Sequence, residues 1–183
     1  EFLVGEAVRQ GADTLLTQGA VQSNHVRQTG AAAAFMGLAC EAILEERVQG
    51  APAAYHESGN VLLDHLFGIP LHRVPAGTAM DAALEALAQK LRAQGRKPYV
   101  IPGGGSNALG SLGYVDCVLE LQRQCDAMGL RKPHLVHATG SAGTQAGLVA
   151  GVHALGLDWP VTGIGVRAPR EAQETRVYEL ALR

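Results

Sequence analysis

Polar side chains that could bind a small ligand stand near the amino end of the chain, where a strand gives way to a helix. Residues 13–17 read as a short β-strand, and Ser23 with Asn24 favours the N-cap of a helix. The first amides of a helix lack partners and the dipole is positive there, so a carboxylate, phosphate or phenolate oxygen is stabilised. Gln22, Ser23, Asn24 and His25 could add hydrogen bonds to a planar ligand. The same residues could equally form an ordinary capped helix.

A second strand-to-helix transition has the composition of a phosphate cradle. Residues 134–139 read as a strand, and a helix is expected over residues 145–155. Glycines in the turn between them let the backbone approach an anion and leave amides pointing at it. The turn lacks the lysine of a nucleotide triphosphate loop, so a phosphate that anchors a cofactor suits it better. Its residues are Gly140, Ser141, Ala142, Gly143 and Thr144.

Three blocks of the chain resemble a family of pyridoxal-phosphate enzymes. Residues 17–29, 98–107 and 138–144 look like the family of D-cysteine desulfhydrases and 1-aminocyclopropane-1-carboxylate deaminases, which includes L-cysteate sulfo-lyases. Residues 59–64 and 166–169 resemble the sulfo-lyase branch. The resemblance implies α,β-elimination from D-cysteine or L-cysteate, giving pyruvate, ammonia and sulfide or sulfite. Deamination of 1-aminocyclopropane-1-carboxylate is the alternative within the family.

Alternating strand and helix patterns predict parallel βαβ units and therefore an α/β fold. The resemblance implies fold type II, similar to the tryptophan synthase β subunit, with parallel twisted sheets flanked by helices and two lobes that hold the cofactor between them. Residues 1–107 would form the small lobe, and residues 108–183 part of the large lobe. The break is placed after the glycine turn at residues 103–105. Helical patterns run up to both ends of the chain, so we expect it to be incomplete at both ends.

The resemblance assigns roles to individual residues. The turn at residues 140–144 would hold the cofactor phosphate, and Asn24 would bond the 3-oxygen of the pyridine ring. Ser23 would be the catalytic residue beside the substrate. The remaining substrate contacts would come from Asn24, His25, Gly105 and Ser106.

The lysine that such an enzyme needs is not evident in the chain. In the family, the Schiff-base lysine precedes the residue that matches Glu1. Lys90, Lys97 and Lys132 are the lysines of this chain, and none is expected beside the cradle. The chain alone is therefore expected to be inactive. The resemblance also implies a homodimer.

Composition argues against several other classes of protein. The net charge of -2 favours neither nucleic acid nor an anionic membrane as a partner. No apolar run reaches the ~20 residues of a membrane span, and the three cysteines lack metal or disulfide spacing, so a cytoplasmic protein is expected. No metal site is predicted from the scattered histidines. Residues 103–108 match a dinucleotide-binding loop, which leaves an NAD-binding oxidoreductase open; a non-catalytic binder of phosphate ligands is a third possibility.

The spacing of apolar residues in the expected helices predicts how they pack. A single helix is expected over residues 53–67, with its inward face at Val61, Leu62, His65 and Leu66. A capping box at Thr78 predicts the start of another helix, whose stripe of Met80, Leu84, Leu87 and Leu91 should enter the core. The charged residues 45–47 are expected to form a solvated loop.

Overall fold

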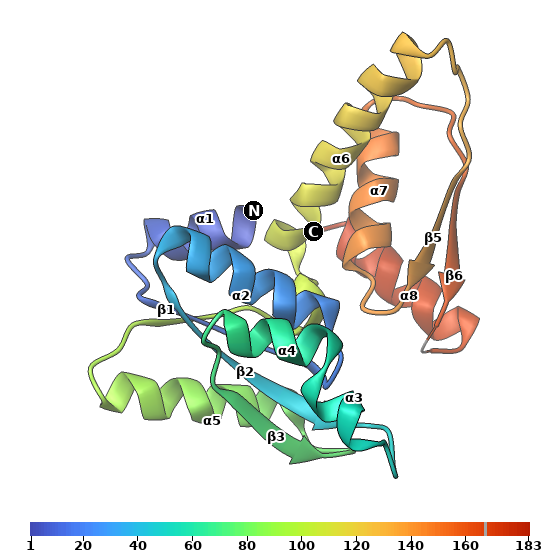
Figure 1. Cartoon of the computed structure of the whole chain (residues 1–183). Coiled ribbons are helices and arrows are strands. Elements are labelled where there is room, and N and C mark those ends of the chain that lie inside the picture. Colours follow the sequence, from blue (N-terminus) through green and yellow to red (C-terminus); the bar gives the residue numbers. More distant parts are fainter. Residues whose placement is uncertain (167) are drawn as a thin grey trace. The chain divides into compact units, whose positions relative to one another are not determined.

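The computed structural model describes residues 1–166 and 168–183, and they form an α/β structure (Figure 1). The chain divides into two compact units. We call Leu3–Gly104 the amino unit, and Glu1–Phe2 together with Gly105–Arg183 the carboxy unit. The division into lobes at residue 107 stays a prediction. Arg167, in the block at 166–169 that resembles the sulfo-lyases, lies outside the described residues.

The elements of the amino unit alternate between helix and strand along most of its length. In order they are α1 (Phe2–Arg9), β1 (Thr14–Ala20), α2 (Asn24–Met36), β2 (Ala39–Glu46), α3 (Ala53–Glu57), α4 (Gly59–Leu66), β3 (Leu71–Pro75), α5 (Met80–Ala93), β4 (Pro98–Val100) and the 3-10 turn η1 (Gly103–Gly105), where the first residue of α1 and the last of η1 are counted in the carboxy unit. The strands form one sheet in the order β3-β2-β1-β4, and all the pairs are parallel. The predicted α/β class is confirmed.

Helices cover both faces of this four-stranded sheet, with α2 and α4 on one side and α5 on the other (Figure 1). Successive side chains of β1 alternate between these faces, as the pleat requires. Thr17 bonds to His25 of α2, whereas Leu16 packs with Leu84 of α5. Side chains on one face of β1, such as Thr17, therefore point toward the start of α2.

The helix α5 carries the predicted apolar stripe but begins later than predicted. Leu84 and Leu91 are buried against Leu16 and Ile43, and Met80 and Leu87 pack at the edge of this cluster. The capping box at Thr78 is wrong, because Ala79 is the N-cap residue and makes no side-chain cap bond. The hydroxyl of Thr78 instead donates to the carbonyl of Pro75 at 2.7 Å, inside the preceding turn.

Residues 53–67 form two helices instead of the predicted single one. Gly59 starts the second helix with φ of +60°, which ends the first. Val61 is buried as predicted, but Leu62 and Leu66 are 48% and 72% exposed. The residue that turns inward is Asp64, which is completely buried. The break rotates α4 relative to the face that a continuous helix would have presented.

The charged segment at residues 45–47 also differs from its predicted place in a solvated loop. Glu45 lies within β2 and is buried. Its carboxylate accepts from the backbone of Gly77 at 2.9 Å and from Nε of Arg47 at 2.5 Å. These hydrogen bonds compensate for the burial of a carboxylate, a group that would otherwise be expected at the solvated surface.

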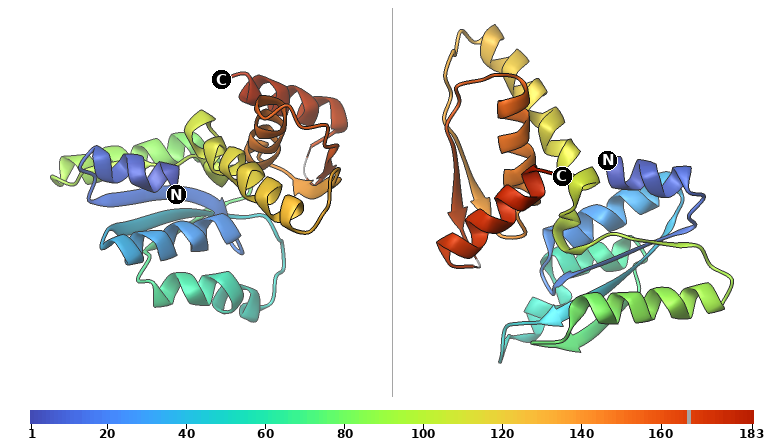
Figure 2. Two further views of the ribbon diagram at one scale, coloured as in Figure 1. Left: turned by 90° about the horizontal axis from the view of Figure 1, so that it is seen from above. Right: turned by 180° about the vertical axis from the view of Figure 1, so that it is seen from behind.

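The described residues of the carboxy unit form a parallel two-stranded sheet and the helices α6, α7 and α8 (Figure 2). Its elements are α6 (Ala108–Ala127), β5 (Leu135–Thr139), α7 (Gly143–Ala154), β6 (Val161–Gly165) and α8 (Arg170–Ala181). One core holds Val118 and Cys125 of α6, Leu148 and Val152 of α7, and Trp159. The helices α6 and α7 lie side by side in both views.

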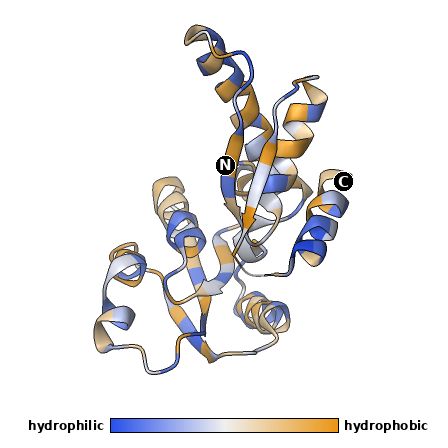
Figure 3. Ribbon diagram, turned by 90° about the vertical axis from the view of Figure 1, so that its right-hand side faces the viewer, coloured by the Kyte–Doolittle hydropathy of each residue, from blue (hydrophilic) through white to orange (hydrophobic). Residues whose placement is uncertain are grey.

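Apolar residues occur along both strands of the small sheet (Figure 3). Leu135 and Val161 pack against the core of the carboxy unit. Val136 and Ile164 point the other way and are 61% and 55% exposed. One face of this sheet is therefore apolar and open in the chain as described.

Other predictions concern cysteines, metals and membranes. Cys40, Cys117 and Cys125 are all free thiols, and burial raises the pKa of Cys40 to about 12. Among the described residues, no group of histidines, cysteines and acids could hold a metal ion. Within that same part of the chain, the helices are too short or too polar to cross a bilayer.

Candidate active site

Ser23 caps α2 directly after β1, and we call this strand-to-helix transition the first junction. The backbone of Ser23 is extended, with φ of -77° and ψ of 117°, and its Oγ accepts from the amide of Val26 at 3.2 Å. This confirms the predicted N-cap. Because Oγ acts here as an acceptor, its own proton remains free to donate to a ligand. The cap also needs a glycine at position 19, where a Cβ would lie 2.5 Å from Oγ of Ser23.

Asn24 follows the cap, and its side chain is exposed. Its Oδ1 accepts from Nδ2 of Asn60 at 2.9 Å. Asn60 is the first residue after the glycine break between α3 and α4, and the sequence analysis gave it no role in the site. Two signals were available: the glycine before it, which is unfavourable inside a predicted helix, and the resemblance of residues 59–64 to the sulfo-lyase branch.

His25 turns toward the sheet at the first junction. Its Nε2 lies 2.7 Å from Oγ1 of Thr17, and that hydroxyl donates to the carbonyl of Ile101 at 3.1 Å. Since the hydroxyl has one proton, the ring must be the donor in the first bond. Burial lowers the pKa of His25 to about 4, so the ring is neutral at pH 7. Its predicted contact with substrate stays a prediction.

The turn at residues 140–144 joins β5 to α7 and forms the second junction. Ala142 has φ of +75°, a conformation that glycine adopts more easily, and it makes no side-chain cap bond. The start of α7 therefore gets no acceptor from its N-cap side chain. This is the arrangement in which helix amides can receive an external anion.

Ser106 contacts the second junction directly. Its Oγ accepts from the amide of Gly143 at 3.2 Å, and a Cβ on Gly143 would lie 2.7 Å from the same atom. The structure thus brings together two residues that the sequence placed in one site. Asn107 caps α6 by accepting from the amide of Gly110 at 2.8 Å, and Gly105 precedes it in η1.

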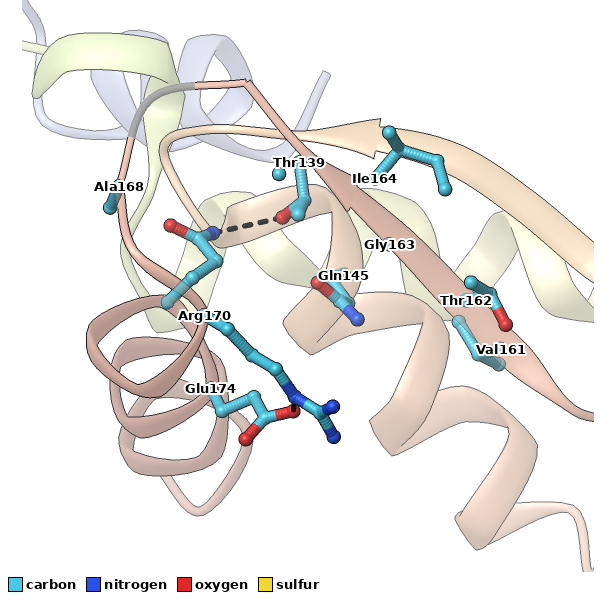
Figure 4. A pocket seen from close by; sticks show the side chains of 11 residues that line it. Thr139, Gln145, Val161, Thr162, Gly163, Ile164, Ala168, Arg170 and Glu174 are labelled. Atoms are coloured by element: carbon cyan, nitrogen blue, oxygen red, sulfur yellow. Dashed lines mark hydrogen bonds and ion pairs between the residues drawn. The ribbon is translucent and has the colours of Figure 1, made fainter.

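A pocket of about 650 Å³ lies beside the second junction in the carboxy unit (Figure 4). Thr139, at the end of β5, lines it and accepts from Nε2 of Gln173 at 2.9 Å. Gln145 reaches it from the start of α7, and Arg170 pairs with Glu174 at 2.7 Å along α8. These α8 residues were not predicted as part of a site, because polar residues spread over all sides of a helix are typical of a solvated helix.

The chain matches one protein family over nearly its whole length. A family model described as pyridoxal-phosphate dependent enzyme covers residues 1–179. The chain belongs to this family. The cofactor class is therefore pyridoxal phosphate, which decides against the dinucleotide-binding interpretation of residues 103–108.

Similar proteins carry more specific names. A D-cysteine desulfhydrase of Salmonella choleraesuis (strain SC-B67) is 48% identical over 181 residues, which is 98% of this chain and 55% of that protein. One from Salmonella paratyphi B (strain ATCC BAA-1250 / SPB7) is 49% identical over 183 residues, covering 100% of this chain and 55% of its own length. The chain thus spans about half the length of the curated relatives it matches.

Solved structures support the predicted fold. A crystal structure of an ACC deaminase homologue matches all of this chain and 54% of its own, with a TM-score of 0.84 and 35% identity. A diaminopropionate ammonia lyase from Escherichia coli matches 88% of this chain and 47% of its own, with a TM-score of 0.62 and 14% identity, so it shows the fold alone. The prediction of a type II pyridoxal-phosphate enzyme is confirmed at the level of fold and family.

The residues at both junctions fit the cofactor of the family. The second junction offers amides at a helix start whose N-cap residue makes no side-chain bond, and Oγ of Ser106 accepts from one of these amides, that of Gly143. The first offers an exposed asparagine amide and a serine proton that no bond within the cap requires. The lysines are not part of either junction. Lys90, Lys97 and Lys132 are all exposed, and Lys132 pairs with Asp158.

Proposed function

We propose that the protein is a pyridoxal-phosphate dependent lyase that acts on D-cysteine and releases pyruvate, ammonia and sulfide. The observation that supports this most strongly is the identity of 48–49% over essentially the whole chain to proteins named D-cysteine desulfhydrase. The ACC deaminase homologue is less similar, at 35% identity. Deamination of 1-aminocyclopropane-1-carboxylate is therefore the second candidate, since that structure shares the fold throughout.

The second junction would anchor the cofactor through its phosphate. The amides of Gly140–Thr144 would donate to the phosphate oxygens, and the hydroxyls of Ser141 and Thr144 would add further donors. Ala142 supports this role, because its left-handed backbone redirects the chain at the point where α7 begins. The positive end of the α7 dipole would favour the same charge.

The first junction would orient the ring and the substrate. Asn24 would donate to the 3-oxygen of the ring, and the hydroxyl of Ser23 would donate to the substrate carboxylate. When bound, pyridoxal phosphate supplies an electron sink for the negative charge that develops at the substrate Cα. His25 would contact the substrate through the edge of its ring. The ring would be neutral, since burial lowers its pKa to about 4. Gly105 and Ser106 would line the substrate side.

The substrate class is tested by product analysis. The full-length protein would be incubated separately with D-cysteine, L-cysteate and 1-aminocyclopropane-1-carboxylate, and pyruvate, 2-oxobutyrate, sulfide and sulfite would be measured. We expect pyruvate and sulfide from D-cysteine. Sulfite from L-cysteate would instead assign the sulfo-lyase reaction, and 2-oxobutyrate the deaminase reaction. No product from any of the three would contradict the proposal.

The proposal also covers the activity of the 183-residue chain alone and the assembly of the full-length protein. We infer that the 183-residue chain by itself releases no pyruvate, since its three lysines are exposed and lie outside both junctions. Pyruvate release by the purified chain would overturn this. A homodimer is the proposed assembly, and light scattering of the full-length protein would test it.

A further inference from the structure

Asn60 connects the start of α4 with the start of α2 through its side-chain amide. Its Nδ2 donates to the backbone carbonyl of Gln22 at 3.0 Å and to Oδ1 of Asn24 at 2.9 Å. Its Oδ1 accepts from Nε of Arg27 at 3.1 Å. Three residues around the first junction therefore contact one amide group.

The identity of these contacts fixes the orientation of the Asn60 amide. The Nε of arginine can only donate, so the atom that faces Arg27 must be the oxygen. A backbone carbonyl can only accept, so the atom that faces Gln22 must be the NH2 group. The two constraints are independent and agree. An amide turned by 180° would lose both bonds.

The orientation of the Asn60 amide determines the orientation of the Asn24 amide. Because the second proton of the Asn60 NH2 group points at Asn24, the Asn24 atom that faces it must be the oxygen. The NH2 group of Asn24 is then turned away from Asn60, on a residue that is exposed. Asn24 consequently offers a donor, and not an acceptor, to a ligand at the first junction.

The backbone around Asn60 is held in turn by Gln22. The amide N–H of Asn60 donates to Oε1 of Gln22 at 2.9 Å. The Nε2 of Gln22 donates to the carbonyls of Tyr55 and Ser58, at 2.6 and 2.9 Å. Gly59 permits this approach, because its φ is +60° and a Cβ there would lie 2.6 Å from Oε1 of Gln22. The break between α3 and α4 is thus what brings Asn60 to the junction.

We propose that Asn60 is a positioning residue that fixes the Asn24 amide as a hydrogen-bond donor to the 3-oxygen of pyridoxal phosphate. This inference rests on the proposed function, in which Asn24 meets that oxygen. A donor stabilises the deprotonated form of the 3-oxygen, whereas an acceptor at the same place would disfavour it. The substitution Asn60→Asp keeps the shape of the side chain but replaces the NH2 donor with an acceptor. The Asn24 amide can then bond the new carboxylate only by turning 180°, so that its NH2 group donates to that carboxylate and its oxygen faces the ligand.

The test is a double-mutant cycle on the full-length protein with pyridoxal 5′-phosphate as the probe. Calorimetric titration would compare the wild type, Asn24→Ala, Asn60→Asp and the double variant. We expect Asn60→Asp to weaken cofactor binding roughly tenfold in the wild-type background and less than about twofold when Asn24 is alanine. The control is Gln124→Glu, which makes the same amide-to-acid change on the exposed face of α6. It should leave binding unchanged.

A spectroscopic readout separates positioning from a general loss of structure. Titration of the bound cofactor's absorption should show a midpoint at higher pH in Asn60→Asp, because the 3-oxygen then faces an acceptor. An unmoved midpoint would overturn the inference. So would an equal loss of affinity in both backgrounds, since Asn60 would then act on the fold and not through Asn24.

A cofactor-free measurement distinguishes this inference from the proposed function. Thermal unfolding of the apo forms should show that Asn60→Asp lowers Tm by more when Asn24 is alanine, because no turned Asn24 amide is then present to donate to the new carboxylate. If Asn24→Ala leaves cofactor affinity unchanged, the assignment of Asn24 in the proposed function fails, and the inference is overturned with it. If Asn24→Ala weakens binding but the Tm effects are additive, the inference alone is overturned.

Discussion

The two strand-to-helix junctions that we propose as cofactor contacts offer hydrogen-bond donors of different kinds. At the first junction the donors are side chains, namely the hydroxyl of Ser23 and the amide of Asn24. The oxygen of Ser23 accepts from the backbone amide of Val26, and the oxygen of Asn24 accepts from the side chain of Asn60. At the second junction the donors are backbone amides, and α7 begins with no cap from the side chain of its N-cap residue. The first junction depends on the orientation of amides and hydroxyls. The second depends on how closely backbone segments approach.

This difference determines which changes each junction can tolerate. A side-chain donor can be turned over or removed while the backbone stays in place. A backbone donor survives most substitutions, but fails when an added atom pushes its helix away. The following changes separate the two kinds of junction, beginning with the largest expected effect.

A buried acid on α4, in the unit that contains the first junction, should make stability depend on pH. Asp64 is completely buried on α4, and neither carboxylate oxygen has a hydrogen-bond partner among the described residues. Burial raises its pKa from 3.8 to about 6, with Arg27 of α2 acting in the opposite direction. Between these values the folded state holds more protons than the unfolded state. The free energy of unfolding should therefore fall as the pH rises from about 4 to 6, on the order of 3 kcal/mol in total.

Urea unfolding of the wild type and Asp64→Asn across this range would measure the effect. His25 opposes it, since its lowered pKa makes the folded state gain stability as pH rises between about 4 and 6.5. The difference between the two proteins at each pH removes the contribution of His25. Asp158→Asn, on an exposed acid of the carboxy unit, is the control. A difference that does not change with pH would contradict the prediction.

A methyl group on α7 should damage the packing behind the second junction. A Cβ at Gly147 would lie 2.2 Å from the carbonyl oxygen of Ser111 and 2.6 Å from the Cβ of Tyr114. Alanine favours a helix by about 1 kcal/mol over glycine, but this overlap involves backbone and should outweigh it. We expect Gly147→Ala to lower the free energy of unfolding by about 2 kcal/mol.

Denaturant unfolding would measure this loss, with Gly5→Ala in α1 as its control. A Cβ at Gly5 meets nothing within 4 Å, so that change should be neutral or stabilising. Equal results for the two variants would show that α7 does not depend on close approach to α6.

The cap at the first junction should be replaceable by another acceptor. Ser23→Ala removes the bond to the amide of Val26 and should cost about 1 kcal/mol of stability. Ser23→Asp keeps an acceptor and should retain most of it, while losing the hydroxyl proton proposed for the substrate. Thermal unfolding would compare both variants. If the aspartate variant is as unstable as the alanine variant, the cap is not the reason for the loss.

The sequence predicted the parts of the two junctions that follow from local chemistry. Ser23 is the cap of α2 because its hydroxyl can accept from an amide three residues later, whatever surrounds it. The apolar stripe of α5 was predictable because it repeats at helical spacing. The parallel sheets followed from alternating strand and helix patterns.

Features that depend on distant residues could not be predicted. The helix over residues 53–67 breaks because Gly59 approaches Gln22, which lies 37 positions earlier in the chain. Glu45 is buried where its carboxylate accepts from the backbone of Gly77, which lies 32 positions later in the chain. Asp64 gave no sequence signal, since an acid on a short helix normally faces water. In each case tertiary contacts overrode the local pattern.

The smallest expected effect concerns the backbone of the second junction itself. Ala142 has φ of +75°, and this conformation costs alanine about 1 kcal/mol or more, whereas glycine adopts it freely. Glycine also loses more freedom on folding, which offsets part of the gain. Ala142→Gly should therefore raise the free energy of unfolding by about 0.5 kcal/mol, as measured by denaturant unfolding. A loss instead would mean that the buried methyl group of Ala142 contributes more by packing than its backbone costs, so side chains would matter at the second junction as well.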